Sequence, residues 1–168
     1  MLFDASAIMN LSRNDRSAAL LDGNTIDLAF YEVGNSIRRK VCVEKVLTME
    51  EGILALDSLT NIMTGMGMVE RVSHRTVLQA AAQGSLTFYD ASYLCAAEAN
   101  NEELVTDDKH LYEVAKKRLK ALKSADVPLT KTELLRRATE PKRVSSDELQ
   151  KSLREERGKR LENPGDGS

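Results

Sequence analysis

The sequence is poor in the residues that build histidine- or cysteine-rich sites. Its 168 residues include two histidines, two cysteines and no tryptophan. His74 and His110 are too few for a histidine-rich metal site. Cys42 and Cys95 lie far apart in apolar, helix-like contexts, which predicts buried thiols in a reducing compartment and neither a disulfide framework nor a zinc site. Any chemistry must therefore rest mainly on carboxylates.

The chain also lacks a basic excess and a long apolar run. With 24 Lys+Arg against 26 Asp+Glu the net charge is −2, so a nucleic-acid partner would need local basic patches. No apolar run approaches the roughly 20 residues that cross a bilayer. The N-terminal apolar stretch contains an acid and follows no basic region, unlike a secretory signal. We therefore expect a cytoplasmic protein with no membrane association.

Short apolar runs alternate along the chain with longer segments of helical periodicity. Strands are expected at Leu2-Phe3, Thr25–Ala29, Met68–Val72, Leu104–Thr106 and, at an edge, Val127–Leu129. Helices are expected around Ala7–Leu11, over Phe30–Val43, from the cap Thr48 to Gly65, through Val77 to Gly84, over Tyr89–Ala99 and over Leu111–Leu122. Strands separated by helices predict an α/β fold with a largely parallel central sheet.

The composition changes near Ala138, beyond which charged residues dominate and large apolar side chains are few. We expect residues 1–137 to form the folded domain. Residues 138–168 are expected to be a charged C-terminal extension, partly helical or disordered, with a candidate helix from a cap at Ser145 to about Leu161.

Asp4 is the first of four acidic positions that stand out. It lies in an otherwise almost unbroken apolar stretch where a strand meets a helix, and burying an ionised carboxylate without partners is expensive. A metal or a hydrogen-bond network would offset that cost. The alternative is that Asp4 or Ser6 simply caps the first helix.

Glu32 and Asp90 are the second and third acids. Glu32 is expected to open the helix over Phe30–Val43, where an acid in the first turn is also favoured by the helix dipole. Asp90 shares a helix face with Leu94 and Ala97, which predicts that it points inward. A capping role would explain why Asp90 lies at the start of the helix, but not why its neighbours on that helix face are apolar.

Asp107 and Asp108 follow the strand Leu104–Thr106. One of the two is a natural N-cap, and two adjacent acids are easier to explain beside a cation. At least three of the four acidic positions are expected at strand-to-helix junctions, which gather at one edge of a parallel sheet. Such a cluster is a hard-oxygen site suited to Mg²⁺ or Mn²⁺, and it indicates metal-dependent phosphoester chemistry.

Four segments in this order resemble the PIN-domain nuclease family over roughly residues 1–135. They are Leu2-Phe3-Asp4-Ala5-Ser6-Ala7-Ile8, Glu32-Val33-Gly34-Asn35, Tyr89-Asp90-Ala91-Ser92-Tyr93-Leu94-Cys95-Ala96-Ala97 and Leu104-Val105-Thr106-Asp107-Asp108. The most specific are the Tyr-Asp-Ala-x-Tyr segment and the Val-Thr-x-Asp strand end.

The resemblance implies a three-layer αβα fold with a central parallel sheet of four to five strands, and an acidic site for one or two Mg²⁺ or Mn²⁺ ions. The family's catalytic and metal-binding acids would be Asp4, Glu32, Asp90 and Asp108. Asp108 is selected over Asp107 because the family's fourth acid stands two residues after a Thr or Ser. Ser6, Asn35 and Thr106 resemble the family's supporting polar positions, and Asp107 completes this supporting set.

PIN proteins of this size resemble VapC-like toxins, which cleave RNA, commonly form homodimers and are silenced by an antitoxin protein. The predicted activity is therefore metal-dependent endoribonuclease. The charged tail departs from the toxin pattern. An RNA-processing or ribosome-maturation nuclease and a non-catalytic PIN-like module that binds RNA or protein stay open. A haloacid-dehalogenase-like phosphatase fits poorly, because Ser6 stands where its motif needs a second Asp.

Basic residues are expected to supply the attraction for RNA that an acidic site lacks. Candidates are Arg38, Arg39, Lys116 and Lys117. Their alternative role is a solvated helix face. The basic residues of the tail, among them Lys142, Arg143 and Arg154, are candidates for further phosphate contacts or for a protein-docking arm.

Overall fold

The computed structural model describes residues 1–14 and 16–139, except for the side chains of residues 137 and 138. By its internal contacts the chain divides after Leu134 into Met1–Leu134 and Leu135–Ser168. The predicted boundary between residues 137 and 138 stays a prediction. The candidate helix from Ser145 to Leu161 and the basic residues of the tail lie outside the described residues.

The first unit is built around a five-stranded, entirely parallel sheet, as predicted. Its strands are β1 (Leu2–Phe3), β2 (Asn24–Thr25), β3 (Gly67–Met68), β4 (Leu104–Val105) and β5 (Ala121–Leu122). The order across the sheet is β3-β2-β1-β4-β5. The two central strands pair Leu2 with Leu104 and Phe3 with Val105, and all four side chains are fully buried.

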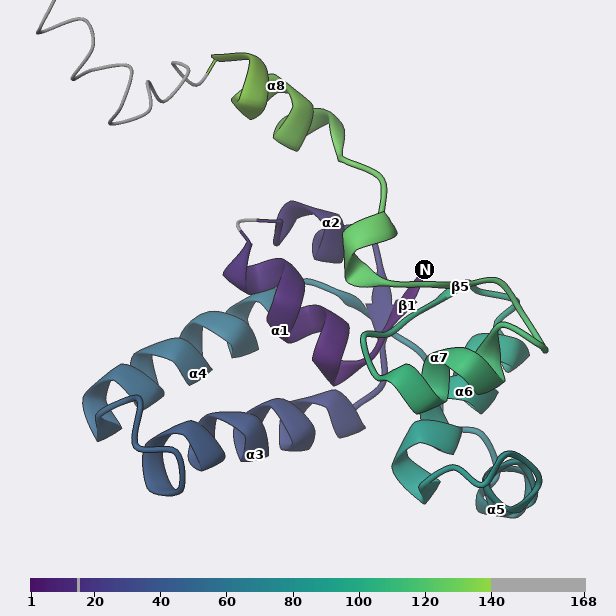
Figure 1. Cartoon of the computed structure of the whole chain (residues 1–168). Coiled ribbons are helices and arrows are strands. Elements are labelled where there is room, and N and C mark those ends of the chain that lie inside the picture. Colours follow the sequence, from purple (N-terminus) through teal and green to yellow (C-terminus); the bar gives the residue numbers. More distant parts are fainter. Residues whose placement is uncertain (15, 140–168) are drawn as a thin grey trace, which may run out of the picture. The chain divides into compact units, whose positions relative to one another are not determined.

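Helices cover both faces of this sheet. They are α1 (Ala5–Arg13), α2 (Ala18–Leu21), α3 (Leu28–Cys42), α4 (Met49–Thr64), α5 (His74–Gly84), α6 (Phe88–Ala99) and α7 (Lys109–Ala115). A further helix, α8 (Lys131–Thr139), runs across the boundary between the two units. Helices α1 to α4 lie on one side of the sheet and α5 to α7 on the other (Figure 1). The order of the strands requires this arrangement if all crossovers are right-handed.

The helices begin and end where local chemistry favours it. The predicted capping box at the start of α4 is present: Thr48 accepts a hydrogen bond from the amide of Glu51, and Glu51 accepts one from the amide of Thr48. Helix α4 ends at the predicted Gly65, and α5 ends at Gly84 before Ser85, which adopts a left-handed conformation. Among the described residues, no helix is long and apolar enough to cross a membrane.

Three predicted strands are shorter than expected, β4 by a single residue, and a fourth is absent. Strand β2 ends at Thr25, because the amide of Ala29 bonds to the carbonyl of Ile26 and the chain enters α3. The apolar run there serves as a helix face, which periodicity cannot distinguish from a buried strand. The predicted strand over Met68–Val72 is limited to Gly67–Met68. Val127–Leu129 forms no strand.

The last crossover differs from the sequence prediction. The expected helix over Leu111–Leu122 ends at Ala115, where the amides of Arg118 and Leu119 both bond to the Ala115 carbonyl. The chain then turns back, and Leu122 pairs with Val105 as the edge strand β5. Cys95 is buried as predicted, but Cys42 is exposed, because it is the last residue of α3 and lies beyond the covered part of that helix.

Candidate functional site

Asp4 directly follows β1 and is both a helix cap and a buried carboxylate. Its Oδ1 accepts a hydrogen bond from the amide of Ala7 at 2.8 Å and one from the hydroxyl of Ser6 at 2.8 Å. Its Oδ2 accepts a hydrogen bond from the hydroxyl of Thr106, which follows β4. Only 5% of Asp4 is exposed. Burial raises the pKa of Asp4 to about 6 despite these hydrogen bonds.

Asp107 ties the end of β4 to two neighbouring segments. Its carboxylate accepts hydrogen bonds from the side-chain amide of Asn10 at 2.7 Å and from the backbone amide of Ser124 at 3.1 Å. Its own amide donates to the hydroxyl of Ser6 at 2.9 Å. Burial would raise the pKa of Asp107, but the hydrogen bonds from Ser124 and Asn10 outweigh it and hold this pKa below its ordinary value.

Asp108 is the N-cap of α7 and is exposed. Its Oδ1 accepts a hydrogen bond from the amide of Leu111 at 2.7 Å. Its other carboxylate oxygen has no hydrogen-bond partner in the described part of the chain. Asp108 therefore has one oxygen without a partner among the described residues, whereas each oxygen of Asp107 accepts a hydrogen bond.

Glu32 lies in the second turn of α3, not in the first. The helix begins at Leu28 and has no acid in its first turn, so the helix-dipole explanation for Glu32 is wrong. Oε2 of Glu32 accepts a hydrogen bond from the hydroxyl of Tyr93 at 2.6 Å. Burial raises the pKa of Glu32, the bond from Tyr93 opposes the rise, and the nearby charge of Asp90 adds to it.

Asp90 lies in the first turn of α6, which follows α5 and not a strand. Its amide donates to the hydroxyl of the N-cap Thr87 at 3.0 Å, and that hydroxyl donates to Oδ2 of Asp90 at 2.7 Å. Asp90 is half-buried, so it does not point fully inward as its helix face predicted. Capping accounts for one of its carboxylate oxygens and leaves the other without a partner among the described residues.

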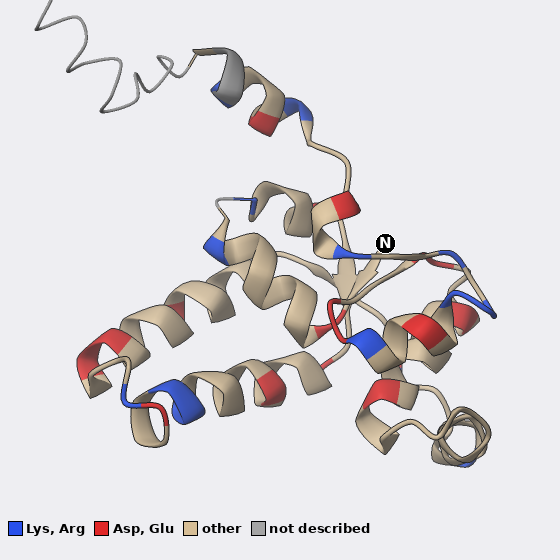
Figure 2. Ribbon diagram, viewed as in Figure 1, with Lys and Arg blue, Asp and Glu red and all other residues tan. Residues whose placement is uncertain are grey.

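The expectation that three of the four acidic positions lie at strand-to-helix junctions is therefore wrong. Asp4 and Asp108 cap the helices that follow β1 and β4, but Glu32 lies farther along its helix and Asp90 follows another helix. Figure 2 shows acidic segments in α3, at the start of α6 and in the connection between β4 and α7. The site draws its carboxylates from both faces of the sheet.

Tyr93 links these acids, and the sequence analysis gave it no role. It is 1% exposed. Burial and the charges of Glu32 and Asp4 raise the pKa of its hydroxyl far above the ordinary value, so it stays a hydrogen-bond donor. The available signal was its position three residues after Asp90, which places both on one face of a helix. Glu32 and Asp4 thus both act on one buried tyrosine, and Asp90 joins them through its charge on Glu32.

Two of the expected supporting residues contact an acid and a third does not. Ser6 and Thr106 both donate to Asp4. Asn35 is exposed and accepts a hydrogen bond from Nε of Arg38 at 3.0 Å. Of these three residues, Ser6 and Thr106 contact an acid that they can orient, and Asn35 does not.

The carboxylates suit a divalent cation in chemistry, although the described residues contain no ready-made group of three or more acidic, histidine or cysteine side chains that would hold one. Oxygen donors are the ligands that Mg²⁺ and Mn²⁺ prefer. The raised pKa values of Asp4 and Glu32 reflect negative charge that is costly to keep buried. A cation would relieve that cost, so the donor set fits such an ion.

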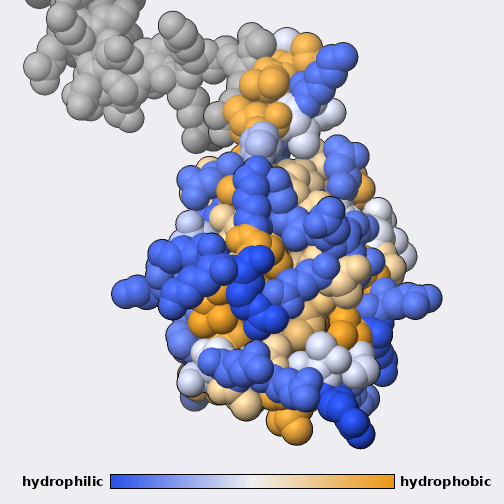
Figure 3. All heavy atoms as spheres, turned by 90° about the vertical axis from the view of Figure 1, so that its right-hand side faces the viewer, coloured by the Kyte–Doolittle hydropathy of each residue, from blue (hydrophilic) through white to orange (hydrophobic). Residues whose placement is uncertain are grey.

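The basic candidates for RNA binding are mostly paired on the surface. Arg39 pairs with Glu44 at 2.8 Å and Lys116 with Glu113 at 2.6 Å. Lys117 is exposed on the face that carries α5 to α7, which Figure 3 shows as largely hydrophilic with scattered apolar side chains. These contacts agree with the alternative of a solvated helix face, and the RNA-binding role stays a prediction.

A basic cleft between α1 and α3 was not found from the sequence. It has a volume of about 320 Å³, and its lining includes Ser6, which holds Asp4. The charged residues of its lining are Arg13, Arg39, Lys40 and Glu44. Arg13 makes no ion pair or hydrogen bond with its side chain among the described residues. The cleft brings cations close to an otherwise acidic site.

A comparison of sequences and a comparison of structures both find similarity to a protein of one organism. It is 31% identical over 86 residues, which are 51% of this chain, to a protein named Exonuclease VapC9 from Pyrobaculum aerophilum, and the match spans 62% of that protein's length. Its fold matches the crystal structure of PAE2754 from Pyrobaculum aerophilum with a TM-score of 0.64 and 27% identity, over 83% of this chain and 96% of the other. No protein-family model matches the chain.

Proposed function

Because the chain is related to the VapC-like PIN-domain proteins in both sequence and fold, we propose that it is a metal-dependent ribonuclease. Asp4, Glu32, Asp90 and Asp108 would hold one or two Mg²⁺ or Mn²⁺ ions. The observation that carries this proposal is the linkage of three acids: Glu32 and Asp4 both act on Tyr93, and the charge of Asp90 acts on Glu32, which concentrates negative charge at the site.

Three of the four proposed ligands are each positioned by side-chain partners of their own. Ser6 and Thr106 fix Asp4, Tyr93 fixes Glu32, and Thr87 fixes Asp90. Such partners hold a ligand in one orientation and keep its basicity. When bound, the ion would polarise a phosphoryl oxygen and lower the pKa of a water molecule that attacks the phosphodiester.

Asp107 is a positioning residue in this proposal. Its bonds to Asn10 and Ser124 hold the turn between β4 and α7, and that turn presents Asp108. Replacing Asp107 would therefore displace Asp108, the fourth proposed ligand, but would not remove its carboxylate.

RNA is the proposed substrate because the basic cleft beside Ser6 gives a polyanion a path to the acids. A VapC-like role further implies action in the cytoplasm, a homodimer and a cognate antitoxin protein that silences the enzyme. Exonuclease activity is the specific alternative to the predicted endonuclease activity, since the similar VapC9 is named an exonuclease. An RNA-processing role and a non-catalytic binding role are the other outcomes of the test.

The test is cleavage of total RNA and of a circular RNA by the purified full chain with Mg²⁺, with Mn²⁺ and with EDTA. We expect metal-dependent cutting that disappears in Asp4→Asn and Asp90→Asn and persists in Asp57→Asn, a control at an exposed acid of α4. Circular RNA has no ends, so cutting it identifies an endonuclease. Cleavage that survives EDTA, or that both site variants retain, would contradict the proposal.

A further inference from the structure

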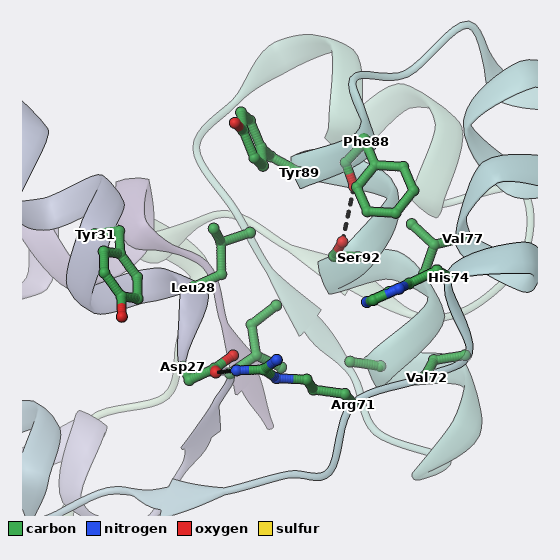
Figure 4. Close-up of a pocket in the computed structure, with 12 residues that line it drawn as sticks. Asp27, Leu28, Tyr31, Arg71, Val72, His74, Val77, Phe88, Tyr89 and Ser92 are labelled. Carbon is green, nitrogen blue, oxygen red and sulfur yellow. Dashed lines mark hydrogen bonds and ion pairs between the residues drawn. The ribbon is translucent and has the colours of Figure 1, made fainter.

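A cavity of about 240 Å³ lies beside the acids, between the start of α3 and the starts of α5 and α6. Tyr31 and Tyr89 stand on one side of it and Phe88 and His74 on the other (Figure 4). His74 and Phe88 meet edge to face with ring centroids 6.1 Å apart. Leu28, Val72 and Val77 contribute further apolar surface.

The aromatic rings of this cavity are unusually open to solvent. The exposed fractions are 75% for Tyr31, 58% for Tyr89 and 40% for Phe88. The sequence has only four tyrosines and three phenylalanines in all, so three of its seven aromatic residues of these types gather here. Exposed aromatic rings around a concave surface are typical of a binding site.

The cavity and the acids share the same two helices. Tyr31 immediately precedes Glu32 in α3, and Tyr89 immediately precedes Asp90 in α6. The bond between Tyr93 and Glu32 joins these two helices, and the cavity is lined by residues of both, Tyr31 and Tyr89 among them. A ligand in the cavity would therefore lie beside any phosphate bound at the acids.

The polar groups of the cavity suit a nucleotide. Arg71 pairs with Asp27 at its edge, and the Arg71 side chain is still 73% exposed. The hydroxyl of Ser92 and the ring of His74 also face it. A flat heterocycle with polar edges, joined to a phosphate, matches aromatic rings flanked by a cation and hydrogen-bonding groups.

We propose that this cavity, lined by Tyr31, Tyr89, Phe88 and His74, binds an unpaired base of single-stranded RNA next to the phosphodiester at the acids. The inference rests on the proposed ribonuclease function and adds to it that the substrate is unpaired at the cleavage site. A paired base is stacked within its helix and cannot enter such a cavity.

The experiment measures binding of the full chain to a fluorescent single-stranded RNA of about ten nucleotides, in EDTA so that no cutting occurs. Two control ligands are measured in the same way. One is the same sugar-phosphate backbone without bases, and the other is the same sequence as a duplex. Since stacking contributes about 1–3 kcal/mol per base, Tyr31→Ala and Tyr89→Ala should bind the single strand about five- to hundredfold more weakly. Two control variants should bind like the wild type. Tyr31→Phe keeps the aromatic ring, and Leu54→Ala changes an exposed apolar residue outside the cavity.

On the base-free backbone all variants should bind equally, and the duplex should bind more weakly than the single strand. Unchanged affinity of both alanine variants, or an equal loss on the base-free backbone, would overturn the inference. A molar mass that falls from two chains to one in Tyr31→Ala, with RNA affinity unchanged, would assign the cavity to a second copy of the chain and also overturn it.

The same samples separate this inference from the ribonuclease proposal. Metal-dependent cleavage by a protein whose alanine variants bind RNA normally would reject the base site alone. Base-dependent binding by a wild type that cuts no RNA would reject the ribonuclease proposal alone.

Discussion

The hydroxyl of Tyr93 donates a hydrogen bond of 2.6 Å to Oε2 of Glu32 and so joins α6 to α3. The two residues are 61 positions apart in the chain, and the helices that carry them lie on opposite sides of the sheet (Figure 1). The bond lowers the pKa of Glu32 against the effect of burial. It therefore helps to keep Glu32 ionised, as a metal ligand must be.

Tyr93→Phe removes this donor without changing the shape of the ring. We expect a loss of about 1–2 kcal/mol in the free energy of unfolding at neutral pH, because the bond is to a charged acceptor. The loss should shrink in acid, where Glu32 is protonated. Urea unfolding measures it, with Tyr112→Phe as the control, because the Tyr112 hydroxyl makes no hydrogen bond among the described residues. Equal losses in the two variants would contradict the prediction.

The pKa of Asp4 predicts how stability depends on pH when no metal is bound. The folded protein binds the Asp4 proton more tightly than the unfolded chain, since its pKa rises from 3.8 to about 6. This contribution to stability is complete below pH 3.8 and is lost as the pH rises through about 6. The free energy of unfolding should fall by up to about 3 kcal/mol over that range.

Unfolding curves in EDTA at a series of pH values test this dependence on Asp4. Asp4→Asn should reduce the fall between pH 4 and pH 6 and leave the part that the raised pKa of Glu32 contributes. A variant with the same slope as the wild type would show that another group titrates.

Asp107 and Asp108 are adjacent, yet their substitutions should have different effects. In Asp107→Asn, the new side-chain NH₂ group would face an N–H group that now donates to the Asp107 carboxylate. Because two donors would then face each other, the substitution should lower the free energy of unfolding by about 1–3 kcal/mol. Asp108→Asn keeps the helix cap, because Asn caps as well as Asp. It should lower metal-dependent cleavage with little change in the unfolding midpoint. The reverse pattern would make Asp107 the fourth ligand.

Two glycines should respond to alanine in opposite directions. A Cβ at Gly23 would lie 2.2 Å from Cε2 of Phe3, a fully buried residue next to Asp4, so Gly23→Ala should destabilise the fold by about 1–3 kcal/mol. A Cβ at Gly34 would meet nothing within 4 Å, so Gly34→Ala should stabilise α3 by up to about 1 kcal/mol. Thermal unfolding of both variants checks the two signs. A stable Gly23→Ala would show that Phe3 can move.

Much of the fold could be predicted from the sequence because its signals are local. The capping box of Thr48 and the stop at Gly65 bound α4, and apolar periodicity identified α3, α5 and α6. The strands were harder to predict, because each has two residues and no alternation to detect. Strand β5 at Ala121–Leu122 was missed, since only pairing with β4 distinguishes it from a continued helix.

The acids were found because charged residues in apolar surroundings are conspicuous, but their connections were not. The link from Tyr93 to Glu32 crosses from one helix to another, and nothing in either segment indicates the partner. The same holds for Asn10 and Asp107, which are 97 residues apart. The aromatic cavity was also missed, because Tyr31 and Phe88 meet only in the folded chain.

The central claim is that Asp4, Glu32 and Asp90 form a divalent-cation site, and calorimetric titration of Mn²⁺ at neutral pH tests it most directly. The wild-type chain should bind Mn²⁺ saturably, and Asp90→Asn should lose that binding while it melts like the wild type, because an Asn side chain can still accept the bond from Thr87. Asp57→Asn should bind like the wild type. Absence of saturable binding by the wild type, or the same binding by Asp90→Asn, would contradict the claim.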